Sequence, residues 1–540
     1  MDTATVPGRL SDSIFLARTL VSAGMARPGR PDRVVRALTG LHRWGPTLAA
    51  GYLGGAARYP RADAVRDELG SLTFEAVHHR TNALAHGLAE RGVKAGGGVA
   101  IMCRNHRGFI EASVACSKLG AHALYLNTSF AGPQVSEVVR REDPLAVVYD
   151  QEFAGVVEQA CDGRSAFVAW IDDPAAALHP SLEELITGSP DFTPRPPAAP
   201  GRTVILTSGT TGPPKGANRA SPSSLGPAAA LLSRIPLKAR ASTLIAAPLF
   251  HSWGFAHLFL STALTSTLVL RRRFDPRETL RAIEAERASA LIVVPVMLQR
   301  ILELGESERA AHDTSSLRVI ASSGSALPGP LAQQVMDALG ETLYNLYGST
   351  EVAWATIATP EDLRAAPGTA GRPPRGTVVK ILDLEWRELP PAESGLIFVG
   401  NELLFEGYTG GGDKVRFGTL MSTGDLGHFD TDGRLFVDGR DDDMIVSGGE
   451  NVFPGEVEEV LAAVPGVSEV AVIGVPDDQF GQRLRAFVTL AAGASLTEQG
   501  LKDEVRSQLA GFKVPREVLI VDGLPRNATG KILKRQLARE

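Results

Sequence analysis

The sequence predicts an α/β protein with a large N-terminal α/β domain of several subdomains, built on parallel sheets and a β-rich subdomain, and a small α+β C-terminal domain. A chain of 540 residues is too long for one hydrophobic core. Strand-like apolar runs alternate with helical periodicity up to about residue 350, which indicates parallel sheets covered by helices. Residues 376–436 instead hold short runs separated by Gly-rich turns, and the last hundred residues mix both patterns.

Residues 1–45 form a separate, arginine-rich N-terminal extension. The favoured interpretation is a helical extension that packs on the main domain. The alternative is an arm that contacts a membrane surface or handles an acyl chain. Its arginines and its apolar residues are Arg18, Arg27, Arg30, Arg33, Arg36, Arg43, Leu10, Ile14, Phe15, Leu16, Leu20 and Val21.

Helices and strands then alternate in the expected order. A helix begins after Thr73, whose side chain can cap it, and places Phe74, Val77, Leu84 and Leu88 on one face. A Gly turn at 96–98 precedes a strand at 99–102. A helix at 109–119, a strand at 122–126, a third helix and a strand at 145–149 follow. A Pro-rich connector at 190–200 then leads to a buried strand at 203–206.

The second half of the chain continues this alternation. Strands are predicted at 243–247, 267–270, 290–294 and 317–321. In the C-terminal region we expect elements at 456–461, 470–475, 484–490 and 517–521. A further helix there is predicted to be capped by Ser495, with Glu498 three residues on.

Composition excludes several classes of protein. A formal net charge of −6 argues against a general nucleic-acid binder. Cys103, Cys116 and Cys161 form neither a disulfide framework nor a zinc pattern, so we expect a reducing, cytoplasmic location, with membrane-peripheral contact as the variant. No apolar run is long enough to span a bilayer, and we see no secretion signal.

Residues 207–216, TSGTTGPPKG, are the strongest candidate site. Glycines let backbone N–H groups approach an anion, the hydroxyls add donors, and Lys215 adds positive charge. The stretch follows a predicted strand, so it is expected to cradle phosphate oxygens. Its spacing differs from G-x-x-x-x-G-K-[ST], so a P-loop fold does not follow. A polar Gly-rich turn is the alternative.

Three further stretches can carry chemistry. In 248–254, His251 can meet a carboxylate beside an apolar pocket, although a core histidine is the alternative. In 344–351, a tyrosine ring can stack on a purine, Thr350 can donate to a phosphate, and Glu351 is a hard oxygen ligand for Mg²⁺. Asp425 in 422–427 suits the two hydroxyls of a ribose, and Arg440 can add a guanidinium contact.

Two stretches of the C-terminal region do not indicate a function by themselves. The acidic run at 441–443 and the basic run at 525–535 are each typical of a solvated turn or face. The glycines at 448–449 form a turn without side chains.

Together these motifs resemble those of the AMP-forming acyl- and aryl-CoA synthetase superfamily, the adenylate-forming enzymes. The six motifs occur in the family order, and the resemblance runs from about residue 50 to the C-terminus. It implies an adenylation domain at 46–439 and a mobile C-terminal domain at 440–540 that pivots at Asp442. It also implies an acid–thiol ligase that uses ATP, Mg²⁺ and CoA.

The resemblance assigns roles to particular residues. The catalytic set is Lys531, Thr350, Glu351 and His251, with Glu351 also holding the metal. The ATP- and AMP-binding set is Thr207, Ser208, Gly209, Thr210, Thr211, Gly212, Lys215, Gly324, Ser325, Ala326, Asn345, Tyr347, Gly348, Ser349, Asp425 and Arg440. The acyl-pocket set is His251, Trp253, Gly254, Val296, Gly324 and Gly348, and the hinge and CoA set is Asp442, Ser447, Gly448 and Gly449.

The implied mechanism divides into two half-reactions. Lys531 serves acyl-AMP formation and then withdraws as the small domain rotates, which presents Gly448–Gly449 to the CoA thiol. Lys531→Ala is therefore expected to abolish only the first half-reaction, and a bulky residue at Gly449 only the second.

The acyl-pocket positions are apolar or small, with no partner for an amino group or a second carboxylate. We expect a medium- or long-chain fatty acid rather than an amino acid or an aryl acid. An acyl-AMP ligase that loads a carrier protein, a nucleotide-binding pseudoenzyme and luciferase-like oxidation remain alternatives.

Overall fold

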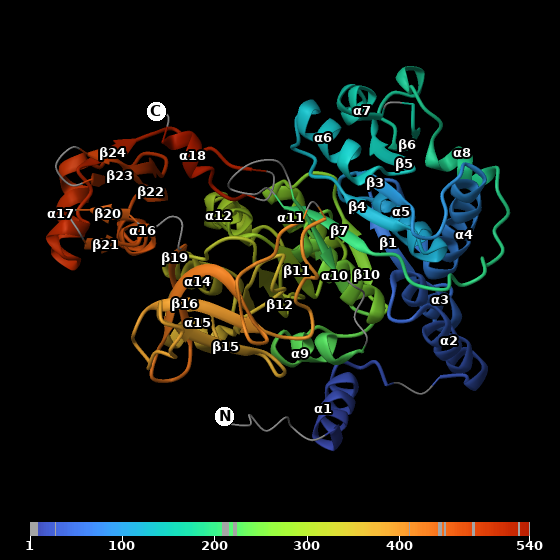
Figure 1. Cartoon of the computed structure of the whole chain (residues 1–540), viewed down its shortest axis with the longest axis horizontal. Coiled ribbons are helices and arrows are strands. Elements are labelled where there is room, and N and C mark those ends of the chain that lie inside the picture. Colours follow the sequence, from blue (N-terminus) through green and yellow to red (C-terminus); the bar gives the residue numbers. More distant parts are fainter. Residues whose placement is uncertain are drawn as a thin grey trace.

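The computed structural model describes residues 9–26, 29–161, 163–207, 215–219, 224–409, 411–440, 445–447, 450–477, 481–527 and 530–538. A large body built on three sheets carries a smaller α+β unit at one end (Figure 1). The predicted α/β class is confirmed.

The first sheet of the body has six strands. It contains β3 (Gly98–Met102), β4 (His122–Tyr125), β5 (Ala146–Asp150), β6 (Ser165–Trp170), β7 (Thr203–Thr207) and β8 (Lys215–Arg219) in the order β6-β5-β3-β4-β7-β8. All pairs are parallel except β7–β8. Its helices are α4 (Phe74–Glu90), α5 (Arg107–Leu119), α6 (Gly132–Glu142), α7 (Ala154–Cys161) and α8 (Leu182–Thr187). The predicted cap is confirmed, because the Thr73 hydroxyl accepts a hydrogen bond from the N–H of Ala76.

The second sheet has eight strands in the order β14-β13-β12-β11-β9-β10-β1-β2, with antiparallel pairs only at its two edges. These are β1 (Asp63–Asp67), β2 (Gly70–Thr73), β9 (Ser242–Ile245), β10 (Thr267–Leu270), β11 (Ala290–Val293), β12 (Val319–Ser322), β13 (Leu343–Tyr347) and β14 (Thr356–Ala358). The helices between them are α9 (Gly226–Arg234), α10 (Ser252–Ala263), α11 (Pro276–Ala285), α12 (Pro295–Glu303), α13 (Glu306–Ala310), α14 (Gly329–Leu339) and α15 (Pro360–Ala365).

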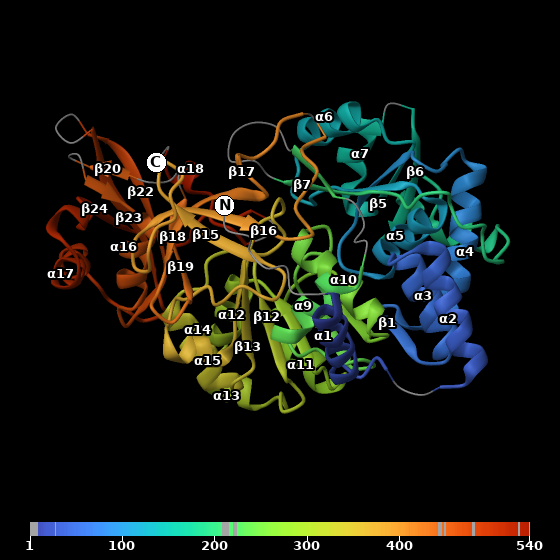
Figure 2. The same ribbon diagram turned by 60° about the horizontal axis from the view of Figure 1, so that its bottom comes forward.

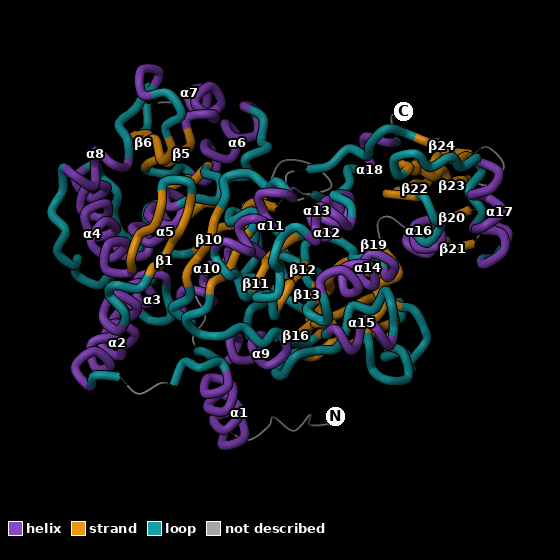
Figure 3. Tube along the Cα trace, turned by 180° about the vertical axis from the view of Figure 1, so that it is seen from behind, coloured by secondary structure: helices purple, strands orange, loops and turns teal. Residues whose placement is uncertain are grey.

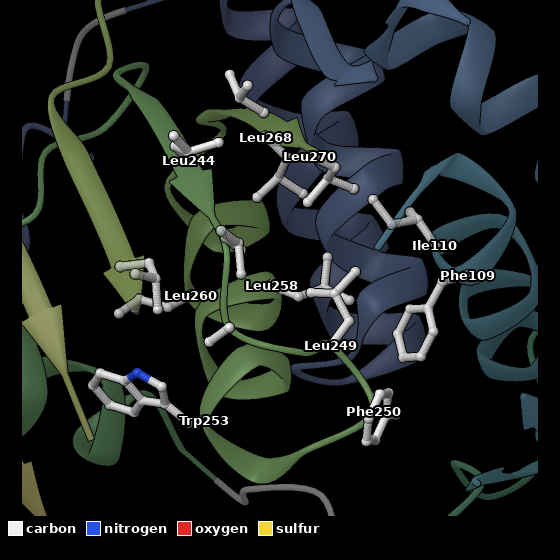
Figure 4. Packing of buried hydrophobic residues seen from close by; sticks show 14 of the residues in the cluster. Phe109, Ile110, Leu244, Leu249, Phe250, Trp253, Leu258, Leu260, Leu268 and Leu270 are labelled. Atoms are coloured by element: carbon white, nitrogen blue, oxygen red, sulfur yellow. The ribbon is translucent and has the colours of Figure 1, made fainter. Parts of the chain in front are cut away.

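One hydrophobic core joins these two sheets. Figure 4 shows Leu258 and Leu260 of α10 with Leu244 and Leu270 of the second sheet, and Phe109 of α5 nearby. Helix α10 therefore lies between the two sheets, and the cavity described below follows this helix.

The third sheet is the predicted β-rich subdomain. Its antiparallel strands are β15 (Val378–Leu382), β16 (Gly395–Gly400), β17 (Arg416–Phe417), β18 (Leu420–Phe429) and β19 (Leu435–Arg440). The C-terminal unit comprises β20 (Ile445–Ser447), β21 (Glu450–Val452), α16 (Pro454–Ala462), β22 (Val467–Asp477), β23 (Gly481–Leu490), α17 (Glu498–Gln508), β24 (Glu517–Ile520) and α18 (Lys534–Leu537). Figure 3 shows this unit from behind, with α18 on the side of α12.

One predicted cap in this unit is wrong. Helix α17 begins at Glu498, and its cap is Thr497, whose hydroxyl accepts from the N–H of Gly500. Ser495 lies two residues before that cap. The Ser495–Glu498 spacing fits a capping box, but Thr497 is in the extended conformation next to the first helical residue and can reach the free N–H groups.

The N-terminal extension is helical and packed, as the favoured interpretation requires. It forms α1 (Arg9–Ser22) and α2 (Pro31–Trp44), and α3 (Leu48–Arg58) follows it. Helix α1 lies beside α9 (Figure 2), and the Lys238 ammonium donates to the Ser22 carbonyl at 2.9 Å. The membrane-surface interpretation stays a prediction. Within the described ranges, no helix combines the length and apolar character needed to cross a membrane.

Candidate active site

An open polar edge lies at the carboxyl ends of β12 and β13. Ser322 and Asn345 are register partners on these parallel strands. The Ser322 hydroxyl and the Asn345 Oδ1 are buried and have no hydrogen-bond partner among the described residues. A buried polar atom without a partner costs about 1–3 kcal/mol, so this pair indicates a bound polar ligand. Ligands of α/β sheets bind at this end of parallel strands.

The loop after β12 leaves this edge accessible. Gly324 has φ +95°, a left-handed conformation that favours glycine, and Gly324 and Ala326 are exposed. Ser325 is half-buried between them. A flat ligand can therefore approach the backbone here.

A hydrogen-bonded group extends from the end of β13 to the β-rich subdomain. The Tyr347 hydroxyl donates to Asp425 Oδ2 at 2.6 Å. Asp425 pairs with Arg440 across β18 and β19, and a guanidinium nitrogen lies 3.6 Å from Asp425 Oδ1. Burial raises the pKa of Asp425, while Tyr347, Arg440 and Lys531 oppose that rise. The Lys531 ammonium of the small unit is therefore within electrostatic reach of Asp425.

Glu351 and Thr350 lie next to this group. The Tyr408 hydroxyl donates to Glu351 Oε1 at 2.7 Å, and the Thr350 and Ser252 hydroxyls are 3.0 Å apart. The Ser349 hydroxyl accepts from the Glu351 N–H at 3.2 Å and so holds the turn. Burial and the Glu351 charge raise the pKa of Tyr408, so its hydroxyl stays a donor. Carboxylate and hydroxyl oxygens are the ligands that Mg²⁺ prefers, so this donor set fits the predicted metal.

Part of the predicted site lies outside the described residues. The strands β7 and β8 are antiparallel, with Thr207 opposite Lys215. The predicted phosphate loop joins them at the carboxyl end of β7. Ser208, Gly209, Thr210, Thr211 and Gly212 lie outside the described residues, as do Asp442, Gly448 and Gly449. Ser447 is the last residue of β20.

His251 lies at the start of α10, at the end of the cavity described below. Its Nε2 is buried without a hydrogen-bond partner among the described residues, and burial lowers its pKa to about 4. The imidazole is therefore neutral at pH 7. His257, six residues further along on α10, shares this property, because burial lowers its pKa to about 4.

These two histidines make stability depend on pH. Each has a folded pKa below the ordinary value of 6.5, so the unfolded chain binds more protons between pH 6.5 and 4. Stability therefore falls as the pH drops through this window, by up to about 1.4 kcal/mol per pH unit for each histidine. We expect the thermal midpoint of His257→Leu to fall less steeply from pH 7 to 5 than that of the wild type. His42→Leu, at an exposed position on α2, is the control, and equal slopes for wild type and His257→Leu would contradict this assignment.

The predicted acyl-pocket residues Trp253 and Gly254 of α10 do not line the cavity described below. The Trp253 indole donates to the Val293 carbonyl at 3.0 Å and packs edge-on against His257 at 4.1 Å. This ring fills the space between α10 and β11. A Cβ on Gly254 would lie 2.2 Å from the Pro248 carbonyl oxygen, and one on Gly348 would lie 2.3 Å from that of Ala353. Both glycines thus allow backbone packing and do not line the cavity.

The cavity itself follows the face of α10 that carries Ser252, Phe255 and Phe259, and it has a volume of about 180 Å³. Its walls come from α3, α5, α9, β4 and β7, together with Thr350, Trp354 and Leu403. The residues of α10 in its lining are Ser252, Phe255, Ala256, Phe259 and Leu260. These span eight residues of helix, or about 12 Å at 1.5 Å per residue. The cavity is therefore elongated and begins at the Ser252–Thr350 hydroxyl pair.

The lining of this cavity is mainly apolar. Arg202, which is exposed, is the single charged side chain in its lining. Serines, threonines, Cys116, Tyr125 and Trp354 supply the other polar side chains. An apolar chain is accommodated along this wall without unpaired charge.

The C-terminal unit contacts the body through α12. A Cβ on Gly530 would lie 2.5 Å from the Val296 Cγ1, so the 530–531 turn rests against the start of α12. One turn along, the Gln299 amide donates to the carbonyl and hydroxyl oxygens of Ser468 at 2.6 and 3.0 Å. The Lys531 N–H is bound by Asn527 Oδ1 at 2.9 Å, which shapes the turn. These contacts keep Lys531 near Asp425.

Sequence models of known families match most of the chain. The AMP-binding enzyme model matches residues 54–409, and the model of the AMP-binding enzyme C-terminal domain matches residues 456–531. The chain belongs to the AMP-binding enzyme family. It is an AMP-forming acid–CoA ligase, which makes an acyl-CoA from ATP, an acid and CoA through an acyl-AMP.

Relatives of this synthetase act on different acids. It is 34% identical to a feruloyl-CoA synthase of Amycolatopsis sp over 89% of this chain and 96% of that protein. It is 32% identical to the fatty acid–[acyl-carrier-protein] ligase ScoC of Streptomyces coeruleorubidus, over 88% and 93% of the two chains. The solved structure of ATP-bound MatB from Rhodopseudomonas palustris is 27% identical, with a TM-score of 0.80 over 92% of this chain and 98% of that one.

Several residues of the synthetase site were missed by sequence reasoning. Tyr408 and the cavity walls on α3, α5 and α9 come from segments without a motif. The pair Gln299–Ser468 joins two units that are far apart in sequence. The sequence carries one indication of the cavity wall, because Ser252, Ala256 and Leu260 follow helical spacing on one face of α10.

Proposed function

We propose that the synthetase activates a medium- or long-chain fatty acid. The supporting observation is the elongated apolar cavity that begins beside Ser252 and Thr350 and follows α10. An acid with its carboxylate at Thr350 would place its alkyl chain along Phe255 and Phe259. Trp253 occupies the space between α10 and β11, which favours this route over the pocket expected from the family.

The nucleotide would bind across the edge of the second sheet. The unpartnered Asn345 Oδ1 suits the amino group of adenine, and Tyr347 supplies a ring at the same edge. Asp425 and Arg440 suit the ribose hydroxyls. The predicted phosphate loop would bind the phosphates, and Glu351 would hold Mg²⁺, which offsets phosphate charge when bound.

The reaction would follow in two balanced steps. A carboxylate oxygen forms a bond to the α-phosphorus of ATP while the bridge to the β-phosphate breaks, and pyrophosphate leaves. The CoA sulfur then bonds to the acyl carbon, the bond to AMP breaks, and the thiol proton passes to solvent. No base is needed in the first step, because the acid is ionised at neutral pH. Positioning and charge stabilisation by Lys531 would supply most of the rate increase.

The domain boundaries of this proposal are 46–439 for adenylation and 440–540 for the mobile unit, with rotation about Asp442. In the rotated pose Ser447, Gly448 and Gly449 would line the path of the CoA thiol arm. Residues 1–45 would form the extension.

Two alternatives concern the acceptor and the acid. The relative ScoC is named for loading an acyl carrier protein, so a phosphopantetheinyl protein is a second candidate acceptor. Comparing it with free CoA in the thioester step decides between them. The feruloyl-CoA synthase relative keeps an aryl acid open, and ferulate belongs in the test panel.

Pyrophosphate release with a panel of acids, with and without CoA, tests the proposal. The panel runs from acetate through octanoate to palmitate and includes ferulate and a long dicarboxylate, which Arg202 could receive. We expect kcat/KM to be highest for an unbranched monocarboxylate of medium or long chain. A preference for ferulate or acetate would contradict the proposal.

A substitution in the cavity sharpens this test. Ala256→Phe places a ring in the space along α10, so we expect kcat/KM for the preferred long acid to fall about 10–100-fold while acetate is affected less. Ala263→Phe is the matched control, because Ala263 lies on the same helix, is half-buried and does not line the cavity. Equal losses for long and short acids would argue against this route for the chain.

A further inference from the structure

The segment ahead of the family match lines one wall of the cavity along α10 and packs behind another. The family model begins at residue 54, yet Thr47 and Leu48 line the cavity. Helix α1 packs behind α9, whose residues Ala228 and Leu231 line another wall. The N–H of Ala239 donates to the Ala23 carbonyl at 2.7 Å and anchors the end of α1. The segment ahead of residue 54 is thus part of the cavity wall, and the extension at 1–45 packs behind it through α1.

The start of α3 is held firmly in place. The Thr47 hydroxyl caps α3 by accepting from the Ala50 N–H, and the Ala49 N–H donates to the Ser117 hydroxyl of α5 at 3.2 Å. On the other side, a Cβ on Gly51 would lie 2.5 Å from the Thr262 Cγ2. Helix α3 is therefore wedged between α5 and the C-terminal part of α10.

This position puts Leu48 at the end of the cavity that is remote from Thr350. Ser252, at the Thr350 end, and Leu260, near α3, both line the cavity and are separated by eight residues of α10. Ser117, whose hydroxyl accepts from the Ala49 N–H, also lines the cavity. Leu48, which is 5% exposed, and Leu260 are large aliphatic side chains at this end. The size of Leu48 therefore affects the space at this end of the cavity.

We infer that Leu48 is the residue that the end of the acyl chain meets, so that the N-terminal segment sets the chain length of the acid. This rests on the proposed function. A side chain at a packed wall excludes or admits methylene groups according to its own size, and one methylene in such a pocket is worth about 10–200-fold in kcat/KM. Leu48 is therefore a specificity-determining residue contributed by the segment outside the family match.

Two substitutions of opposite effect test this inference. In Leu48→Ala, the ratio of kcat/KM for palmitate to that for octanoate should rise about tenfold, because the cavity deepens. In Leu48→Phe the same ratio should fall about tenfold. Leu38→Ala is the control, since Leu38 is 60% exposed on α2 and does not line the cavity. Pyrophosphate release is the readout, with thermal unfolding measured in parallel.

A general loss of stability would lower the activity with every acid alike and would leave the ratio unchanged. Opposite shifts of the ratio in the two variants therefore support the inference, and an unchanged ratio in both overturns it. Failure of the wild type with every fatty acid would overturn the proposed function, and the inference with it. An active wild type with unshifted variants overturns the inference alone.

Discussion

Lys531→Ala is expected to slow acyl-AMP formation by about 10²–10³-fold and to leave thioester formation from supplied acyl-AMP close to the wild-type rate. The reason is electrostatic. The Lys531 ammonium lies within reach of the Asp425 carboxylate, so it can offset charge that develops on the α-phosphate beside the ribose. In the second half-reaction that phosphate leaves with AMP, and the rotated unit would no longer present Lys531.

Pyrophosphate release measures the first step, and acyl-CoA formation from synthetic acyl-AMP measures the second. Lys534→Ala is the matched control. Lys534 is three residues away, and its ammonium pairs with Glu458 at 2.7 Å inside the small unit. If losing a lysine side chain acted only by destabilising the small unit, both variants would lose activity. If Lys531→Ala lowered both half-reactions equally, the proposed role would be wrong.

Gly530→Val is expected to slow acyl-AMP formation about 10²-fold without removing any charge. Gly530 has φ +81°, a left-handed conformation that a β-branched residue rarely adopts. Its Cβ would also lie 2.5 Å from the Val296 Cγ1 of α12. Either effect moves the 530–531 turn away from the body, and a displacement of about 1 Å can cost 10²-fold in rate.

Gly523→Val separates this effect from a general loss of backbone freedom. Gly523 is in the same unit, and a Cβ there would meet nothing within 4 Å. We expect it to behave as wild type in both half-reactions. The double variant Gly530→Val, Val296→Ala should recover part of the lost rate, because the collision is relieved while the strained φ remains. Absence of any loss in Gly530→Val would mean that the turn does not need this contact with α12.

The Gln299–Ser468 contact is a second contact between α12 and the small unit. Its hydrogen bonds join a helix of the body to β22 of the small unit one turn beyond the Val296–Gly530 contact. Two contacts on successive turns of one helix define the orientation of a rigid unit better than one contact can. The orientation of the small unit that brings the Lys531 charge to bear on Asp425 is thus also supported by a contact remote from the proposed reaction site.

Sequence reasoning predicted most of the elements because their signals are local. Neighbouring residues alone determine three of these signals: the Thr73 cap, the buried runs of β3 to β5 and the Gly-rich turns of the β-rich subdomain. The Ser495 cap was wrong for a local reason too, since Thr497 competes for the same N–H groups. The motif residues Tyr347, Asp425 and Arg440 were found, and the structure brings them together.

The route of the acyl chain could not be predicted in this way. The Trp253 indole donates to the Val293 carbonyl on β11, a contact that no local pattern predicts. The cavity along α10 exists because α3, α5, α9 and β7 meet there. The helices α3, α5 and α9 carry no motif, and their approach depends on glycines such as Gly51 whose purpose is visible only at the contact.

The sequence by itself determined the alternation of helices and strands, the charged and hydroxyl residues suited to a nucleotide, and the family. Those are properties of residue type and spacing, which the chain carries before it folds. Only the tertiary structure decided which residues of α10 line a cavity, that Leu48 of the N-terminal segment lines it too, and that the Lys531 charge acts on the pKa of Asp425. The physical reason is that cavities and charge pairs arise from side chains far apart in sequence, whose distances are set by the packing of whole elements.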